Sequence, residues 1–119
     1  MTALELSREA ARILDNKKAK DIKVLEIKEI SSLGDYFVVA SGSSTTQVKA
    51  MADELEFQLK EQGVLPKRVE GYQSAAWIVL DYYDVIIHLF YEETRQFYSL
   101  ERLWNDAPLL DISDLTHSE

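Results

Sequence analysis

The sequence feature that most constrains the fold is the uninterrupted apolar stretch Tyr36-Phe37-Val38-Val39-Ala40, followed directly by Ser41-Gly42-Ser43-Ser44. A strand with one face in water alternates apolar and polar residues, whereas a strand covered on both faces does not. The stretch is therefore predicted to be a central strand that is buried on both sides. The glycine and serines end it, and Ser44 and Gln47 have the capping-box spacing of a helix N-terminus.

Cap residues and hydrophobic periodicity predict two long helices. Thr2 and Glu5 also have capping-box spacing and open a helix over residues 2–18. The helix that opens at Ser44 is expected to stop at Gly63, because glycine accepts the left-handed backbone of a helix end. The residues at helical spacing in this second helix, predicted to form its buried stripe, are Val48, Met51, Ala52, Leu55 and Leu59.

Four further strands and one more helix complete the predicted order. Runs of β-branched and aromatic residues predict strands at 22–28, 66–70, 75–80 and 84–91, and a helix is predicted at 92–104. The strands 75–80 and 84–91 are close enough in sequence to form a hairpin. Interleaved β and α elements followed by a hairpin and a helix are typical of an α/β (α+β) fold, with a mixed β-sheet and helices mainly on one face.

The length of 119 residues fits one domain, and 46% hydrophobic residues supply its core. This domain is assigned to residues 1–105. Residues 106–119 are acidic and lose periodicity, so they are expected to form a flexible C-terminal tail. Four apolar residues of the tail could still dock on the domain, namely Leu109, Leu110, Ile112 and Leu115.

Composition excludes several classes of function. The chain has no cysteine, which excludes disulfides, thiolate zinc sites and a cysteine nucleophile. Its net charge of −8 would repel a phosphate backbone, so direct DNA binding is not expected, and a basic protein is the better partner. No signal-peptide core and no apolar run of membrane-spanning length are present, so we expect a cytoplasmic protein that does not bind membranes.

The most tempting catalytic feature is the strand–Gly42-Ser43–helix step, because nucleotidyltransferases cradle a phosphate at such a step. That chemistry also needs carboxylates that hold Mg²⁺. Asp53 and Glu54 lie in the middle of a predicted helix, while Asp81 and Asp84 are separated by a turn and lack a third acid. A simple helix cap explains the step better. We therefore expect no enzyme, no catalytic residue, no metal and no cofactor.

Trp77 and His88 raise the possibility of a binding surface. A sheet covered by helices on one side leaves its other face free, and both side chains could lie there. The pattern alone does not decide between Trp77 as a core residue and Trp77 as an interface residue. Glu92 and Glu93 are ambiguous in the same way, because acids in a first helical turn either stabilise the helix dipole or form a charged rim.

The order of short motifs along the chain resembles the Iojap-like family, the ribosomal silencing factors. These motifs extend over nearly the whole chain up to Trp104. They are Lys20-Asp21-Ile22, Ser31-Ser32-Leu33-Gly34-Asp35-Tyr36, Ala40-Ser41-Gly42-Ser43-Ser44 with Gln47-Val48, Pro66, Glu70-Gly71, Ser74-Ala75-Ala76-Trp77-Ile78-Val79-Leu80-Asp81, Asp84-Val85-Ile86-Ile87-His88-Leu89-Phe90, Glu92-Glu93, Arg95, Tyr98 and Leu100-Glu101-Arg102-Leu103-Trp104. Each motif is short, but their joint order is specific.

The resemblance implies a nucleotidyltransferase-like fold that lacks the catalytic acids. It also implies a ribosomal silencing factor that binds ribosomal protein uL14 on the large (50S) subunit and sterically blocks the small subunit, which represses translation. Homodimers are common among isolated members of the family, so a homodimer is expected for the free chain.

The resemblance favours an interface role for Trp77 and His88, which lie in its densest motifs. The predicted contact set for uL14 is Glu70, Trp77, Asp81, His88, Glu92, Glu93 and Tyr98. Two alternatives remain open: a degenerate nucleotidyltransferase-fold nucleotide-binding protein or enzyme, and a dimeric adaptor whose exposed sheet face serves self-association.

Overall fold

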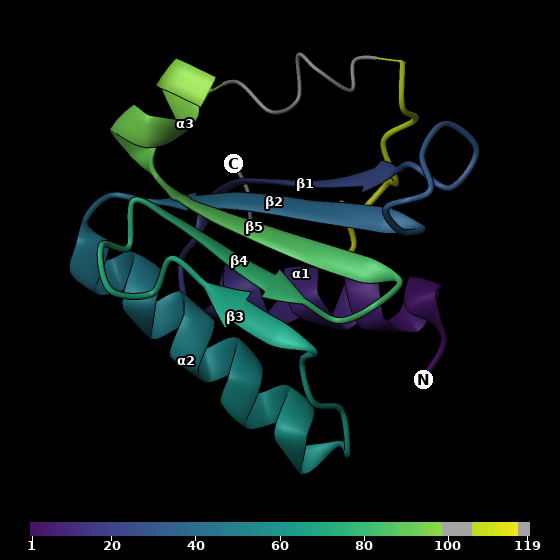
Figure 1. The fold of residues 1–119 in the computed structure, drawn as a ribbon, viewed down its shortest axis with the longest axis horizontal. Helices are drawn as coiled ribbons and strands as arrows, with labels where there is room; N and C mark the ends of the chain where they lie inside the picture. Colours follow the sequence, from purple (N-terminus) through teal and green to yellow (C-terminus); the bar gives the residue numbers. More distant parts are fainter. Residues whose placement is uncertain (99–105, 117–119) are drawn as a thin grey trace.

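The structure is a computed structural model that describes residues 1–98 and 106–116 (Figure 1). Its centre is a five-stranded sheet in the order β1-β2-β5-β4-β3. The strands are β1 (Lys20–Glu26), β2 (Tyr36–Gly42), β3 (Arg68–Glu70), β4 (Trp77–Asp81) and β5 (Val85–Tyr91). β2 pairs with β5 in parallel, while the β1–β2, β4–β5 and β3–β4 pairs are antiparallel. The predictions of a mixed sheet and a β4–β5 hairpin are confirmed.

The predicted central strand is also confirmed, because every residue of β2 is buried. The starts of the other four strands differ from the prediction by one or two residues, and for β1 and β4 the backbone shows why. β1 begins two residues early because a bulge near Asp21 still allows Lys20 to pair with Ser41. β4 begins at Trp77 rather than Ala75, because Ala75 has a φ of 58° and cannot be part of an extended strand.

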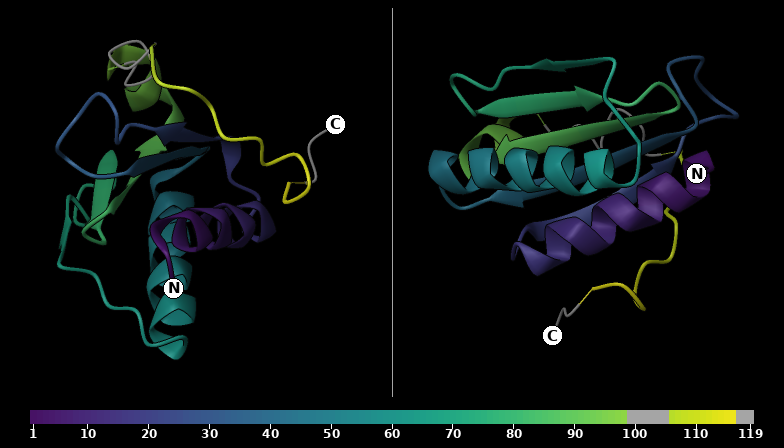
Figure 2. Two further views of the ribbon diagram at one scale, coloured as in Figure 1. Left: turned by 90° about the vertical axis from the view of Figure 1, so that its right-hand side faces the viewer. Right: turned by 90° about the horizontal axis from the view of Figure 1, so that it is seen from below.

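Helices α1 (Ala3–Asn16) and α2 (Thr45–Glu61) cover the same face of the sheet (Figure 2). The predicted capping box at Thr2 and Glu5 is complete, and the buried side of α2 is the predicted stripe. The larger hydrophobic core lies between these helices and the sheet. None of the helices within the described ranges has the length and apolar character needed to cross a membrane.

The last helix, α3 (Glu92–Tyr98), follows β5 directly and lies on the opposite side of the sheet from α1 and α2 (Figure 2). The helix was predicted to reach Trp104, but residues 99–105 lie outside the described residues. The fold prediction of helices mainly on one face therefore holds for the two long helices.

The described part of the tail, residues 106–116, lies along the outer edge of β1 (Figure 1). The backbone N–H of Glu26 donates to the Pro108 carbonyl, and that of Leu110 donates to the Val24 carbonyl, each at 2.9 Å. The residues that pack against the larger core are Leu110, Ile112 and Leu115, whereas Leu109 stays exposed. Three of the four apolar residues of the tail thus dock on the domain. The flexibility of the tail stays a prediction.

Candidate functional site

The face of the sheet opposite α1 and α2, called the distal face below, carries four of the seven predicted contact residues. Trp77 pairs with Phe90, Val79 pairs with both His88 and Glu70, and Asp81 pairs with Ile86 and Arg68. Residues that pair across strands point to the same side of the sheet. Because alternate residues of a strand share a face, the register places four predicted residues on the distal face, namely Glu70, Trp77, Asp81 and His88.

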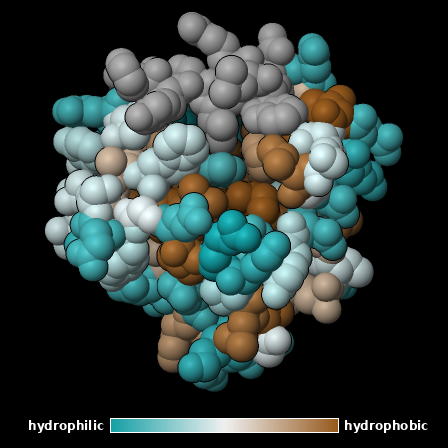
Figure 3. Space-filling model, viewed as in Figure 1, coloured by the Kyte–Doolittle hydropathy of each residue, from teal (hydrophilic) through white to brown (hydrophobic). Residues whose placement is uncertain are grey.

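An aromatic group lies at the centre of this face. The Trp77 indole Nε1–H donates to His88 Nδ1 at 3.1 Å. The Phe90 ring stacks on Trp77 with centroids 5.0 Å apart, and the Phe37 ring meets His88 edge-on at 4.6 Å. Trp77 remains half-buried, whereas the other three rings are buried. Figure 3 shows apolar side chains at the centre of the view, surrounded by hydrophilic ones.

His88 is neutral in this environment, because burial lowers its pKa from 6.5 to about 4. Since Nδ1 accepts the indole N–H, the ring proton lies on Nε2. Nε2 is buried and has no hydrogen-bond partner among the residues that the structure describes. An unsatisfied buried N–H is unfavourable, so packing alone gives no reason for a histidine here. This observation favours a functional role for position 88.

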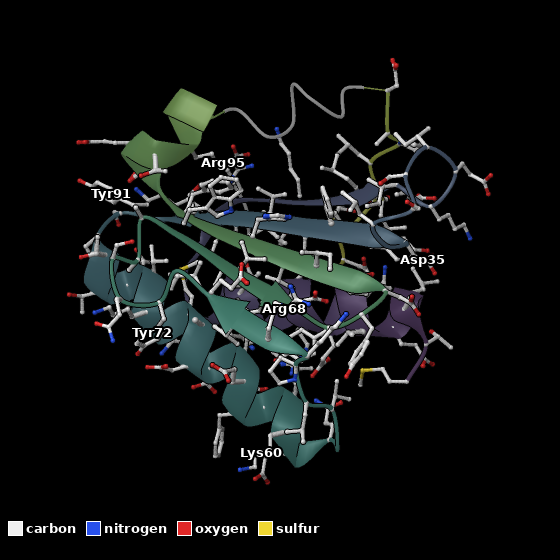
Figure 4. The ribbon with its side chains drawn as sticks, in the orientation of Figure 1. Asp35, Lys60, Arg68, Tyr72, Tyr91 and Arg95 are labelled. Atoms are coloured by element: carbon white, nitrogen blue, oxygen red, sulfur yellow. The ribbon has the colours of Figure 1, made fainter. Side chains whose placement is uncertain are left out.

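The acids of the predicted set surround the aromatic group. The Asp81 carboxylate is 4.0 Å from Arg68 and accepts the backbone N–H of Tyr83, so it also stabilises the hairpin turn. Figure 4 labels Arg68 on β3, at the front of the sheet. Glu70, also on β3, is exposed. Asp81 is thus partly committed to the fold, while Glu70 is available to a partner.

The remaining predicted residues belong to α3. Glu93 is exposed, and the Glu92 carboxylate lies 3.6 Å from the Lys20 ammonium. Tyr98 is the last residue of α3 as described, and its side chain lies outside the described residues. From Ile86, opposite Asp81, to Glu92 the chain advances six residues, or roughly 20 Å at strand spacing. The six predicted residues whose side chains the structure describes are therefore spread along a strip, a distribution that suits contact with a protein.

The Gly42-Ser43 step is occupied by contacts within the chain. The backbone N–H and the hydroxyl of Ser43 both donate to Gln47 Oε1, at 2.7 and 2.9 Å. Ser44 is the N-cap as predicted, and its hydroxyl accepts the Gln47 N–H. The reciprocal bond of the capping box differs, because Gln47 accepts from Ser43 rather than from the Ser44 N–H. Three donors at this step, the N–H and hydroxyl of Ser43 and the N–H of Gln47, are thus used by the helix cap. Within residues 1–98 and 106–116, no cluster of three His, Asp or Glu side chains could hold a metal ion.

Sequence reasoning did not identify the role of Arg95. It is only 6% exposed, although arginine is rarely buried, and its guanidinium contacts Asp21 and Ser41. Arg95 and Lys20-Asp21 both lie in the motifs of the family resemblance, but no periodicity connects them. Phe37 and Phe90 were likewise expected as strand residues, not as partners of His88 and Trp77.

A small acidic α/β protein with an aromatic and acidic face has the properties of a protein-binding module. The family model of "ribosomal silencing factor during starvation" matches residues 1–119, and the chain belongs to this family. It is 41% identical over 112 residues to the ribosomal silencing factor RsfS of Halalkalibacterium halodurans, covering 94% of this chain and 96% of that protein. This relative and the Bacillus subtilis protein of the same name are named as silencing factors, which are regulators, and not as enzymes.

A more distant relative and a solved structure also resemble this chain. The chain is 34% identical over 95 residues to the mouse (Mus musculus) protein named mitochondrial assembly of ribosomal large subunit protein 1, covering 77% of this chain and 42% of that protein. A crystal structure of a Chromobacterium violaceum protein superposes with a TM-score of 0.85 at 37% identity, covering 88% of both chains. The mixed α/β fold is thus shared within the family. The likeness to nucleotidyltransferases stays a prediction.

Proposed function

We propose that this chain binds ribosomal protein uL14 on the large ribosomal subunit and sterically blocks the joining of the small subunit, which represses translation. It acts by binding rather than by catalysis, in the cytoplasm. The free chain is a homodimer, as the family resemblance implies. The proposed contact residues of this chain lie on the distal face and on α3, and they are Glu70, Trp77, Asp81, His88, Glu92, Glu93 and Tyr98.

The observation that carries the proposal is the pairing of Trp77 with His88. A half-buried tryptophan that is held in one orientation by a hydrogen bond is a rigid anchor, and aromatic anchors dominate the energetics of protein interfaces. Glu70 pairs with Val79, two residues from Trp77, and Glu92 and Glu93 follow soon after Phe90, the strand partner of Trp77. Their carboxylates suit Lys and Arg side chains of a basic partner. An acidic chain is repelled by RNA phosphates, so on the ribosome it is better suited to contact a ribosomal protein than RNA.

The test is co-sedimentation with isolated large subunits. Trp77→Ala combined with Glu92→Lys should weaken binding by about a hundredfold or more, since it removes the anchor and reverses a charge. Phe57→Ala combined with Glu61→Lys is the matched control, because Phe57 and Glu61 are exposed on α2, away from the distal face. The control should bind like the wild type. Wild-type binding by the folded Trp77/Glu92 variant would show that the contact set is wrong.

The identity of the partner is tested separately. The chain has no cysteine, so Val79→Cys introduces a single attachment point for a photocrosslinker in the middle of the distal face. The expected product on large subunits is a crosslink to uL14. A crosslink only to ribosomal RNA, or to another ribosomal protein, would contradict the proposed partner. Small-subunit joining, followed by light scattering, should slow in the presence of the wild type.

A further inference from the structure

Arg95 is a buried arginine that connects α3 to the sheet. Its Nη1 donates to the Asp21 carbonyl oxygen at 2.7 Å and to the Ser41 hydroxyl at 2.9 Å. Its Nη2 lies 3.4 Å from the Asp21 carboxylate. Figure 4 shows Arg95 between α3 and the sheet. The guanidinium therefore joins three elements: α3, the start of β1 and the end of β2.

The backbone of β1 is distorted where it meets Arg95. Asp21 has a φ of 53°, in the left-handed region, and the β1–β2 register shifts between Lys20 and Lys23. A β-bulge turns a residue away from its regular direction. Here both the carbonyl and the carboxylate of Asp21 reach the same guanidinium. The adjacent Lys20 is paired with Glu92, so the start of β1 holds α3 at two points.

Arginine at this position is not explained by packing. Burying a guanidinium is unfavourable unless its hydrogen bonds are made, and an apolar side chain would anchor a short helix without that cost. An apolar contact has no direction, whereas the planar guanidinium fork fixes angles as well as distance. The contacts of Arg95 therefore define how α3 is oriented.

We propose that Arg95 is a positioning residue for partner binding, which sets α3 so that Glu92 and Glu93 present their carboxylates to a basic partner at the end of the distal face. This inference rests on the proposed function. In this proposal Arg95 is not part of the surface that contacts the ribosome. It affects the affinity indirectly, by positioning Glu92 and Glu93.

The first test compares affinities for isolated large subunits. Arg95→Met removes the fork and keeps the length of the side chain, and it should weaken binding about tenfold. The direction is informative, because removing a positive charge alone would strengthen attraction to a basic partner. Arg8→Met is the matched control: it removes the same charge from α1, where Arg8 pairs with Asp114. It should bind as tightly as the wild type or slightly tighter. An unchanged affinity for Arg95→Met would overturn the proposal.

The second test is a double-mutant cycle. In a chain that carries Glu92→Gln and Glu93→Gln, Arg95→Met should cost less than twofold in affinity, because the groups it positions are gone. A further tenfold loss in that background would overturn the proposal, since Arg95 would then act independently of the acids.

If Arg95→Met does not fold, Ser41→Ala replaces it. This change removes one hydrogen-bond acceptor of Arg95 and keeps the charge. It should weaken binding about threefold, and only when both glutamates are present. Wild-type affinity of Ser41→Ala would then overturn the proposal.

A third measurement separates this inference from the proposed function. Spin labels on Phe57→Cys in α2 and Glu93→Cys in α3 report the distance between the two helices without any partner. Arg95→Met should broaden or shift that distance distribution, whereas Arg8→Met should not. If the wild type fails to bind large subunits, the proposed function is wrong, and the label distances still test the positioning. An unchanged distribution in the Arg95 variant would overturn the positioning alone.

Discussion

His88 illustrates at the scale of one residue how burial becomes a pH dependence of stability. Burial lowers the pKa of His88 to about 4 in the folded chain, while the unfolded chain retains the ordinary value of 6.5. Between these values the unfolded chain binds a proton that the folded chain does not. The free energy of unfolding therefore falls as the pH falls from 6.5 to 4, and is independent of this group above 6.5.

We predict that His88 contributes a loss of about 3 kcal/mol over that pH range, since one pKa unit corresponds to about 1.4 kcal/mol. Urea denaturation of the wild type and His88→Gln at several pH values checks this. The difference between the two unfolding free energies should change with pH. The carboxylates are common to both proteins, so their contribution cancels in this difference. His117→Gln, which changes the only other histidine, serves as the control. Parallel pH curves for the wild type and His88→Gln would contradict the prediction.

At the scale of an element, the start of β4 depends on the backbone of Gly71. Gly71 has a φ of 82°, and a Cβ atom added there would lie 2.1 Å from the Trp77 carbonyl oxygen. Gly63, after α2, has a similar φ of 80°, but an added Cβ meets nothing within 4 Å. The two glycines share a positive φ, which strains any substituted side chain, and they differ in the space available, so they form a matched pair.

We predict that Gly63→Ala destabilises the fold by about 1 kcal/mol, the cost of placing alanine at positive φ. Gly71→Ala should cost roughly 3 kcal/mol or more, because the backbone of β4 must also move. Urea denaturation of both variants gives the two values. Gly71→Ala should also weaken binding to large subunits, since Trp77 moves with β4. Equal costs for the two substitutions would show that the close approach at Gly71 relaxes freely.

The elements themselves could largely be predicted from the sequence, because their signals are local. The run from Tyr36 to Ala40 predicted a central strand, and Thr2 with Glu5 predicted the first helix boundary. Alternation of strand residues showed that Trp77 and His88 could share one face, but it left Trp77 undecided between the core and an interface. Their hydrogen bond did not, because it depends on the register between β4 and β5.

Contacts between distant parts of the chain could not be predicted in this way. Arg95 and Asp21 are 74 residues apart, and no periodicity in the sequence connects a helix residue with a strand bulge. The docking of the tail on β1 likewise uses backbone hydrogen bonds, which carry no side-chain signature. The parallel pairing of β2 with β5 brings together strands separated by a helix and two other strands.

At the scale of the whole molecule, the net charge of −8 matters through its distribution. Glu70 lies on β3 and Glu92 and Glu93 lie on α3, whereas Glu54 and Glu61 lie on α2, which covers the other face. Charges near a contact act over about the Debye length, which is about 8 Å at physiological salt and longer in dilute buffer. The acids on the distal side should therefore govern the salt dependence of partner binding, and those on α2 should not.

We predict that raising the salt concentration from about 50 to about 300 mM weakens wild-type binding to large subunits by roughly tenfold. Glu92→Gln with Glu93→Gln should bind more weakly at low salt and respond less to added salt, because part of the attraction is already removed. Glu54→Gln with Glu61→Gln removes the same charge from α2 and should keep the wild-type response. Contact with ribosomal RNA would give the opposite sign: neutralising Glu92 and Glu93 would then relieve repulsion of phosphates and tighten binding at low salt. Affinities of the three proteins at the two salt concentrations therefore decide whether the acidic face meets a basic protein or nucleic acid.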